Sequence, residues 1–293
     1  MKLPVFTSCC SALVTPFLGG QINYPMVEQL LRRQIESGIR AVVIAGTTGE
    51  ASTLSDTEKL ELIRRAKKYV GDKCMIIAGT GSNDTAHAAA LSEAAQEAGA
   101  DALLVVSPYY NKATEDGLYA HYLAIAHRVR IPVIVYNVPS RTGVDIPVSV
   151  YKRLSRIPNI AGVKEASTDM VKVARTIAEC GSELPVWSGN DDLAVAAMAL
   201  GAKGVISVAS NVAPDEVKLM TDAALDGDFD TAADLQGKLL PLNDLLFCEV
   251  NPIPVKAAMK LTGYDCGECR LPLTNISQAN RDKLSLFLTK KYG

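Results

Sequence analysis

The chain alternates between short apolar runs and longer segments in which apolar and charged residues recur at helical spacing. The apolar runs are rich in β-branched residues and end in Gly, Ser, Thr, Pro or Asn, which is typical of strands that lead into turns. Because the runs are apolar at successive positions, we expect strands buried on both faces of a parallel sheet. Eight strands are predicted, at residues 11–15, 41–45, 75–78, 102–106, 133–136, 160–163, 185–187 and 205–208.

The segments between these strands carry helix start and stop signals. Ser55 and Glu58 have the spacing of a capping box, in which each side chain accepts a bond from the other residue's backbone N–H. Further helices are predicted to begin at the polar pairs 83–84, 168–169 and 190–191. Helices are predicted to end at Gly38, Gly99 and Gly201.

This alternation predicts an α/β protein, a (β/α)8 TIM barrel. Eight strand–helix units fit within residues 1–226, close to the ~250 residues typical of such a barrel. The alternative is a doubly wound open sheet, which usually has fewer strands and a phosphate fingerprint after the first one. Beyond residue 226 only helices are predicted, at residues 230–245, 254–261 and 275–290. We therefore predict a catalytic barrel domain at residues 1–226 and a small C-terminal helical domain at residues 227–293.

Composition narrows the function classes. The 293 residues are 48% hydrophobic and 21% charged, which excludes a disordered chain. Lys and Arg number 30 against 32 Asp and Glu, so no nucleic-acid partner is expected. The longest uncharged stretch, residues 3–27, is interrupted by proline and glycine, so no membrane span is predicted. Residues 2–14 resemble a secretion signal only faintly and lack an Ala-x-Ala-like site, so a cytoplasmic protein is expected.

The cysteines suggest free thiols rather than a disulfide framework. Their number, seven, is odd, and their spacing is irregular in a chain of this length. Cys266 and Cys269 form a single C-x-x-C motif. A zinc site would require two further ligands, either a second cysteine pair or suitably spaced histidines. The three histidines lie far away in sequence, so no metal site is predicted and loop thiols are the favoured interpretation.

Polar side chains follow all eight predicted strands, where a barrel places its active site. Turns alone require only turn-forming residues. Tyr110, Tyr136, Arg141 and Lys164 are residues of other kinds. Because the carboxyl ends of barrel strands meet at one mouth, these side chains are expected to converge there.

Lys164 is the most informative of them, because it directly follows the apolar residues 161–163. A lysine at this place can reach solvent or pair with Glu165, and that alternative stays open. A buried environment instead disfavours the charged ammonium, and the neutral amine can attack a carbonyl to form a Schiff base. Lys164 is therefore the candidate nucleophile.

Schiff-base formation moves protons, both when the amine adds and when water leaves. The strand-end segments contain no histidine, so the candidate proton carriers are the hydroxyls of Thr47, Thr48, Tyr110 and Tyr136. The alternative for Tyr110 is an aromatic pair with Tyr109 that packs a loop.

Two further features suit a small carboxylate. Arg141 can hold a carboxylate through two parallel hydrogen bonds, although an ordinary surface arginine is the alternative. The Gly-Thr-Thr-Gly-Glu sequence at residues 46–50 leads into a helix, and glycine-rich backbone at a helix start attracts anions. The Gly-Lys-Ser/Thr of an ATP-binding loop is missing there.

The motifs together resemble those of the pyruvate-dependent class I aldolases, the family of dihydrodipicolinate synthase and N-acetylneuraminate lyase. The resemblance covers essentially the whole chain and implies a lyase. Each motif alone is modest, but the ordered set is specific: residues 12–17, 46–50, 77–82, 108–111, 136–143, 163–166, 204–208 and 251–256.

The resemblance implies a catalytic set. Lys164 matches the lysine that forms a Schiff base with pyruvate, and Tyr136 matches the proton donor and acceptor beside it. Thr47 and Tyr110 match the other members of a hydroxyl relay, with Tyr110 reaching in from a neighbouring subunit. The family usually forms homotetramers built from tight dimers, and it needs no cofactor because pyruvate is held covalently.

The resemblance also implies substrate contacts. Thr48, Ile206 and Gly189 match substrate-binding positions, and Arg141 matches the residue that holds the carboxylate of L-aspartate 4-semialdehyde. The pyruvate enamine attacks this aldehyde, and cyclisation yields a heterocycle on the route to diaminopimelate and lysine. The pair at residues 47–48 with Tyr110 and Arg141 favours the synthase within the family. Sugar-acid aldolases or dehydratases, which can share the sequence of residues 46–50, and N-acetylneuraminate lyase are the alternatives.

Feedback-inhibited family members bind lysine at a subunit interface. The corresponding residues here are Ala51, Ser52, Asp56, Lys59, Asn83, His87 and Tyr109. Histidines or a glutamate are expected at some of these positions, where Asp56, Lys59 and His87 stand instead. Asp56 would accept a lysine ammonium, but Lys59 would repel it. We predict weak or absent inhibition by lysine.

Overall fold

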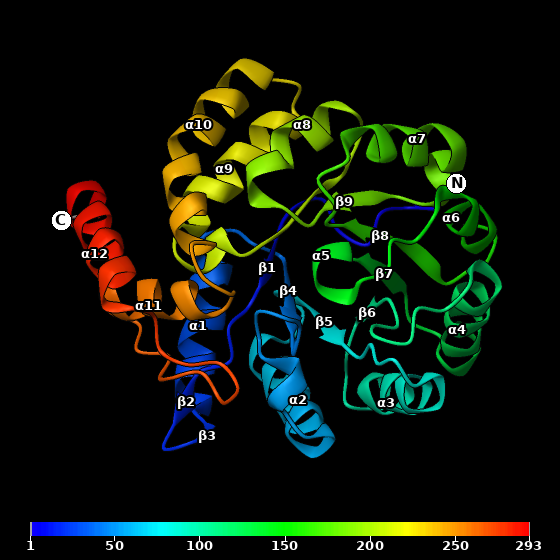
Figure 1. Cartoon of the computed structure of the whole chain (residues 1–293), viewed down its shortest axis with the longest axis horizontal. Coiled ribbons are helices and arrows are strands. Elements are labelled where there is room, and N and C mark those ends of the chain that lie inside the picture. The colour runs from blue at the N-terminus through cyan, green and yellow to red at the C-terminus, as the bar shows by residue number, and fades with distance from the viewer. Residues whose placement is uncertain (1, 293) are drawn as a thin grey trace.

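The structure, a computed structural model, describes residues 2–292. Within these residues, eight parallel strands close into a barrel, and helices surround it (Figure 1). In spatial order the barrel strands are β1 (Ser8–Ala12), β10 (Gly204–Ser207), β9 (Val186–Ser188), β8 (Ile160–Glu165), β7 (Val133–Asn137), β6 (Ala102–Val106), β5 (Met75–Gly79) and β4 (Ala41–Ile44). The closed barrel confirms the predicted α/β TIM-barrel class and rules out the open sheet.

The helices occupy the connections between successive strands. Those that belong to the barrel are α1 (Tyr24–Glu36), α2 (Asp56–Val70), α3 (Thr85–Glu97), α4 (Glu115–Arg128), α5 (Pro139–Thr142), α6 (Val148–Leu154), α7 (Met170–Cys180), α8 (Ala194–Ala199) and α9 (Pro214–Leu225). Short 3-10 turns lie at Ala51–Thr53, Gly181–Glu183, Asp191–Leu193 and Ala209–Asn211.

The first strand differs from its prediction. β1 begins at Ser8, three residues before the predicted start, and ends at Ala12. The reason is that its polar residues are buried and bonded: Ser8 Oγ donates to Asp222 Oδ1 at 2.6 Å, and Ser11 Oγ accepts from Ser210 at 2.9 Å. A small hairpin, β2 (Phe17–Leu18) and β3 (Gln21–Ile22), follows and was not predicted.

Most of the helix signals act as predicted. The capping box of Ser55 and Glu58 is present at the start of α2, and Asp84 and Asp169 cap α3 and α7. Asp191 differs, because its Oδ2 accepts from the backbone N–H groups of Val208 and Ala209 at 2.8 and 3.1 Å. It therefore ties the end of β10 to the 3-10 turn at Asp191–Leu193. The three glycines predicted as helix ends have φ of +80°, +99° and +112°: Gly38, Gly99 and Gly201.

The core has two layers, which explains why the strands are apolar at successive positions. One cluster fills the barrel interior and includes Val43, Trp187 and Ile206. A larger cluster lies between the strands and the helices and includes Val42 and Val205. Alternate residues of a strand thus face the two layers, apart from the irregularity at the start of β8.

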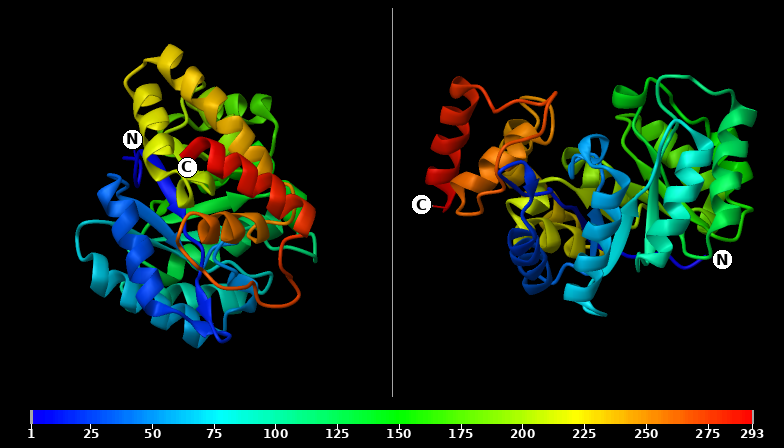
Figure 2. Two further views of the ribbon diagram at one scale, coloured as in Figure 1. Left: turned by 90° about the vertical axis from the view of Figure 1, so that its left-hand side faces the viewer. Right: turned by 90° about the horizontal axis from the view of Figure 1, so that it is seen from below.

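Three helices follow the barrel within residues 227–292: α10 (Phe229–Leu246), α11 (Ile253–Leu261) and α12 (Gln278–Tyr292). α10 packs against α8 and α9, and α12 lies at the end of the molecule opposite α4 (Figure 2). Their buried residues continue the outer core cluster, and the domain boundary at residue 226 stays a prediction. Among residues 2–292 no helix has the length and apolar character that crossing a bilayer requires.

Candidate active site

A cavity of about 360 Å³ opens at the carboxyl ends of the barrel strands. Its walls come from the segments after β4, β7, β8, β9 and β10 and from the segment between α10 and α11. Six of the residues predicted for the site line it: Thr47, Thr48, Tyr136, Arg141, Lys164 and Gly189.

Lys164 and Tyr136 form the centre of this site. They are paired Cα to Cα on the neighbouring parallel strands β8 and β7. The Lys164 side chain is buried (5% exposed), and its Nζ lies 4.4 Å from the centre of the Tyr136 ring. Their equal register makes both side chains face the same side of the sheet, so the amine and the phenol meet at the cavity.

The alternative interpretation of Lys164, a pair with Glu165, is wrong. The Glu165 carboxylate accepts from Asn137 Nδ2 at 2.8 Å and from the Tyr151 hydroxyl at 2.9 Å. Neighbouring residues of a strand face opposite sides, which turns Glu165 away from the cavity. Burial also removes the option of a solvated lysine.

Gly189 is required by the close approach of the lysine stem. A Cβ at this position would lie 2.5 Å from Ala166 Cβ and 3.1 Å from Lys164 Cε. Only glycine leaves Lys164 its present place, which gives Gly189 a physical reason independent of any substrate contact.

The segment with Thr47 and Thr48 is held by the C-terminal part of the chain. Asn251 Nδ2 donates to Thr48 Oγ1 at 3.0 Å. Glu50, with φ of +57°, forms a buried ion pair with Lys256 of α11, and the atoms Oε1 and Nζ are 2.7 Å apart. A charge buried without its partner is costly, so this pair fixes the segment after β4 against α11.

Arg141 lies on α5 and is exposed at the cavity rim. Its Nη2 donates to the backbone oxygen of Asn251 at 3.4 Å. Asn251 itself lines the cavity, and its buried Oδ1 has no hydrogen-bond partner among the described residues. Asn251 carried no role in the sequence analysis, because its neighbours in the site come from distant parts of the chain.

Two predicted residues lie apart from the cavity. Tyr110 is 89% exposed, with φ of +74°, and is not among the residues that line the cavity. Ile206 is fully buried in the inner core cluster, and Val208, two residues later, lines the cavity instead. The exposure of Tyr110 agrees with a role outside its own subunit.

A second cavity of about 580 Å³ adjoins the first and shares Thr47, Tyr136 and Arg141 with it. Most of the residues predicted for lysine binding line it: Ala51, Ser52, Asp56, Lys59, His87 and Tyr109. Asn83 is not among its lining residues.

Asp56 already has two partners in this second cavity. His87 Nε2 lies 2.7 Å from Asp56 Oδ2, and Lys59 Nζ lies 3.6 Å from Asp56 Oδ1. Burial raises the pKa of Asp56, but these partners outweigh it and leave the pKa below its ordinary value. The carboxylate is therefore charged and occupied.

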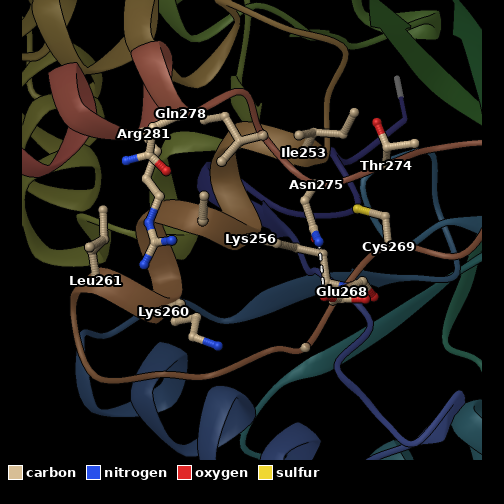
Figure 3. Close-up of a pocket in the computed structure, with 13 residues that line it drawn as sticks. Ile253, Lys256, Lys260, Leu261, Glu268, Cys269, Thr274, Asn275, Gln278 and Arg281 are labelled. Carbon is tan, nitrogen blue, oxygen red and sulfur yellow. Dashed lines mark hydrogen bonds between the residues drawn. The ribbon is translucent and has the colours of Figure 1, made fainter.

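A third, smaller cavity of about 210 Å³ lies between α11 and the segment before α12 (Figure 3). Lys256 Nζ donates to the backbone oxygen of Glu268 at 3.0 Å, and Asn275 Nδ2 donates to Glu268 Oε1 at 2.9 Å. None of its lining residues lines the Lys164 cavity. Its contacts hold the partner of Glu50 in place.

The cysteines of the described chain are all free. Burial raises the pKa of Cys266 to about 12 and that of Cys269 to about 11, so both thiols stay protonated at neutral pH. Among residues 2–292 no group of three or more His, Cys, Asp or Glu residues is arranged to hold a metal ion.

Fold and site together define a (β/α)8 barrel with a buried lysine at the carboxyl mouth of its strands, beside a tyrosine of the next strand. The sequence pattern of the Dihydrodipicolinate synthetase family matches residues 5–291. The chain therefore belongs to this family.

Known proteins match this chain in sequence and in structure over nearly its full length. The 4-hydroxy-tetrahydrodipicolinate synthase of Thermoanaerobacter sp. (strain X514) is 48% identical to this chain. The match spans 99% of this chain and 98% of that enzyme. The crystal structure of dihydrodipicolinate synthase from Aquifex aeolicus is similar with a TM-score of 0.96 at 44% identity, covering 98% of each chain. The enzyme from Acinetobacter baumannii, complexed with pyruvate, has a TM-score of 0.95 at 42% identity, covering 97% of this chain and 98% of the other.

Proposed function

We propose that this chain condenses pyruvate with L-aspartate 4-semialdehyde, the reaction of a 4-hydroxy-tetrahydrodipicolinate synthase. The observation that carries the proposal is the buried Lys164 amine 4.4 Å from the centre of the Tyr136 ring. The named relatives support this reaction over that of a sugar-acid aldolase or N-acetylneuraminate lyase. The product lies on the route to diaminopimelate and lysine.

The reaction proceeds through covalent intermediates on Lys164. The neutral amine attacks the ketone carbon of pyruvate, and the carbinolamine loses water to give an imine. Loss of a methyl proton converts the imine to an enamine, whose carbon attacks the aldehyde carbon of the second substrate. The amino group of that substrate then displaces Lys164 by transimination and closes the ring. The protein needs no cofactor, because the protonated imine itself withdraws electrons.

Hydroxyl groups move the protons. Tyr136 is next to Lys164 and exchanges protons with the carbinolamine and the leaving water. Thr47 lies at the boundary of the two adjoining cavities, and Tyr110 of a second subunit completes the relay. Thr48 and Gly189, which line the cavity, bound the space in which pyruvate sits.

The second substrate binds at the rim. Arg141 holds its carboxylate, because the guanidinium matches a carboxylate with two hydrogen bonds. Asn251, whose backbone oxygen accepts from Arg141, offers its unpartnered Oδ1 to the substrate amino group. One substrate molecule then satisfies both groups, and a substrate without an amino group leaves the Asn251 oxygen unpaired.

The exposure of Tyr110 supports an assembly of at least two subunits, and a homotetramer of tight dimers is the form we propose. We place the protein in the cytoplasm, where pyruvate and the aldehyde are available. No nucleic acid or membrane takes part in the proposed reaction.

The choice of aldehyde is tested by turnover. The purified protein is supplied with pyruvate and either L-aspartate 4-semialdehyde or glyceraldehyde, and consumption of pyruvate is followed. Faster turnover of the semialdehyde is expected. Faster turnover of glyceraldehyde would identify a sugar-acid aldolase instead.

A further inference from the structure

Asn137 and Glu165 directly follow Tyr136 and Lys164 and form the next pair across β7 and β8. Because side chains alternate along a strand, this pair faces the helices whereas the catalytic pair faces the barrel interior. Asn137 Nδ2 donates to Glu165 Oε1 at 2.8 Å, and both residues are buried. The two strands are thus joined by side chains at the level of the catalytic residues.

Several segments converge on this pair from outside the barrel. Glu165 Oε1 also accepts from Ser167 N at 2.9 Å, and Oε2 accepts from the Tyr151 hydroxyl of α6 at 2.9 Å. Lys172 of α7 places its Nζ 3.5 Å from Glu165 Oε2 and also pairs with Asp145.

The side-chain amide of Asn137 also has hydrogen-bond partners for both its nitrogen and its oxygen. Its Nδ2 donates to Asp145 Oδ1 at 2.8 Å, and its Oδ1 accepts from Ile146 N at 3.0 Å. Asn137 and Glu165, with Asp145, Tyr151 and Lys172, therefore make one network that ties α6 and α7 to the strand ends. Buried networks of this kind hold a single arrangement only when every member keeps its partner.

The side-chain contacts between these two strands matter because the strand pairing is irregular near the start of β7 and β8. Val133 pairs with Ile160, but Ile134 pairs with Gly162, so Ala161 is left out of the ladder. An irregularity of this type shifts the register of everything that follows, and a slip of one residue turns each side chain to the other face. Lys164 faces the cavity only in the shifted register.

We propose that Glu165, Asn137 and Tyr151 are positioning residues, which hold β7 and β8 in the register that sets Lys164 beside Tyr136. The proposal rests on the proposed function, because its consequence is the rate at which Lys164 captures pyruvate. Tyr151 is the member to change first, since Tyr151→Phe removes one hydroxyl and keeps the ring.

Tyr122→Phe is the matched control. Tyr122 of α4 is also fully buried, but its hydroxyl donates to the backbone oxygen of Val105 in β6 at 3.3 Å and not to Glu165. For both variants the melting temperature, kcat, the KM for pyruvate and the rate of covalent trapping by pyruvate with sodium borohydride are measured.

We expect both variants to lower the melting temperature, and only Tyr151→Phe to slow trapping and lower kcat. The slowing should be between ~10-fold and ~100-fold, the range that a misplaced reacting group causes, with little change in KM. Glu165→Gln, which keeps an acceptor for Asn137, should retain more of the trapping rate than Glu165→Ala.

Equal trapping rates in Tyr151→Phe and Tyr122→Phe would overturn the positioning role and leave the proposed function intact, since the wild type would still capture pyruvate. A wild type that captures no pyruvate would overturn the proposed function and the positioning role with it.

Discussion

The Nζ of Lys164 lies over the ring of Tyr136, 4.4 Å from its centre, because the two residues are paired across β8 and β7. This pairing joins the proposed nucleophile and the proposed proton carrier without a loop between them. Groups on rigid strands keep their geometry more closely than groups on loops, which suits a reaction of several covalent steps.

Gly189→Ala should displace the lysine. The added methyl group would lie 3.1 Å from Lys164 Cε and 2.5 Å from Ala166 Cβ. We expect the rate of pyruvate trapping to fall by ~10-fold to ~100-fold, because a small displacement of a reacting group has effects of that size. Gly237→Ala is the control: it lies within α10 with no atom within 4 Å of the new Cβ, and should stabilise the protein by ~0.5–1 kcal/mol with unchanged trapping. Normal trapping by Gly189→Ala would contradict this account of the glycine.

Subunits that lack different catalytic groups should complement each other. If Tyr110 acts in a neighbour's site, Tyr110→Phe and Lys164→Ala homo-oligomers are each impaired. Mixed by unfolding and refolding together, they form pairs in which one site has both Lys164 and Tyr110. The mixture should recover activity beyond the sum of its parts, measured as turnover of pyruvate and the semialdehyde. Strict additivity would show that Tyr110 does not act in the site of a neighbouring subunit.

Lysine should inhibit the protein weakly or not at all. Asp56, the one acidic side chain in the predicted lysine set, is already bonded to His87 and lies 3.6 Å from Lys59. A ligand ammonium would meet the positive charge of Lys59 there. The initial rate should stay unchanged at millimolar lysine, and strong inhibition would show that the pairs around Asp56 open to admit the ligand.

Acid should weaken the fold through His121. Burial lowers the pKa of His121 from 6.5 to about 4, and its Nδ1 is bonded to Thr85 Oγ1 at 2.9 Å. Between pH 6.5 and pH 4, His121 is therefore protonated in the unfolded chain but neutral in the folded protein. Its contribution to the free energy of unfolding is fully present above pH 6.5 and is lost as the pH falls towards 4. The free energy of unfolding should fall by about 2 kcal/mol between pH 7 and pH 5 from this residue.

Urea unfolding at the two pH values measures this effect. His121→Gln should remove most of the His121 contribution, whereas His127→Gln, at an exposed position, should leave the pH dependence as it is. Equal pH dependence in both variants would exclude His121 as its source.

Local patterns were sufficient for the barrel and for the position of Lys164. Each barrel strand except β1 lies within two residues of its predicted bounds, because apolar runs and helix caps are read from neighbouring residues. β1 was misplaced because Ser8 and Ser11 are polar residues that find buried partners, Asp222 and Ser210, which are distant in sequence.

The residues that surround and support the site could not be predicted from local sequence patterns. Asn251 reaches Thr48 across 203 residues, and Lys256 reaches Glu50 across 206. Nothing in the sequence around Tyr151 indicates that its hydroxyl donates a hydrogen bond to Glu165. Contacts of this kind depend on how the closed barrel brings distant segments together, and the single sequence carries no periodic signal for them.

The most direct measurement is peptide mass mapping after incubation with pyruvate and sodium borohydride. One pyruvate-derived group per subunit should be found on the peptide that contains Lys164, and Lys164→Ala should take up none. A wild-type protein that stays unmodified, or an adduct carried by another lysine, would contradict the assignment of Lys164 as the Schiff-base residue.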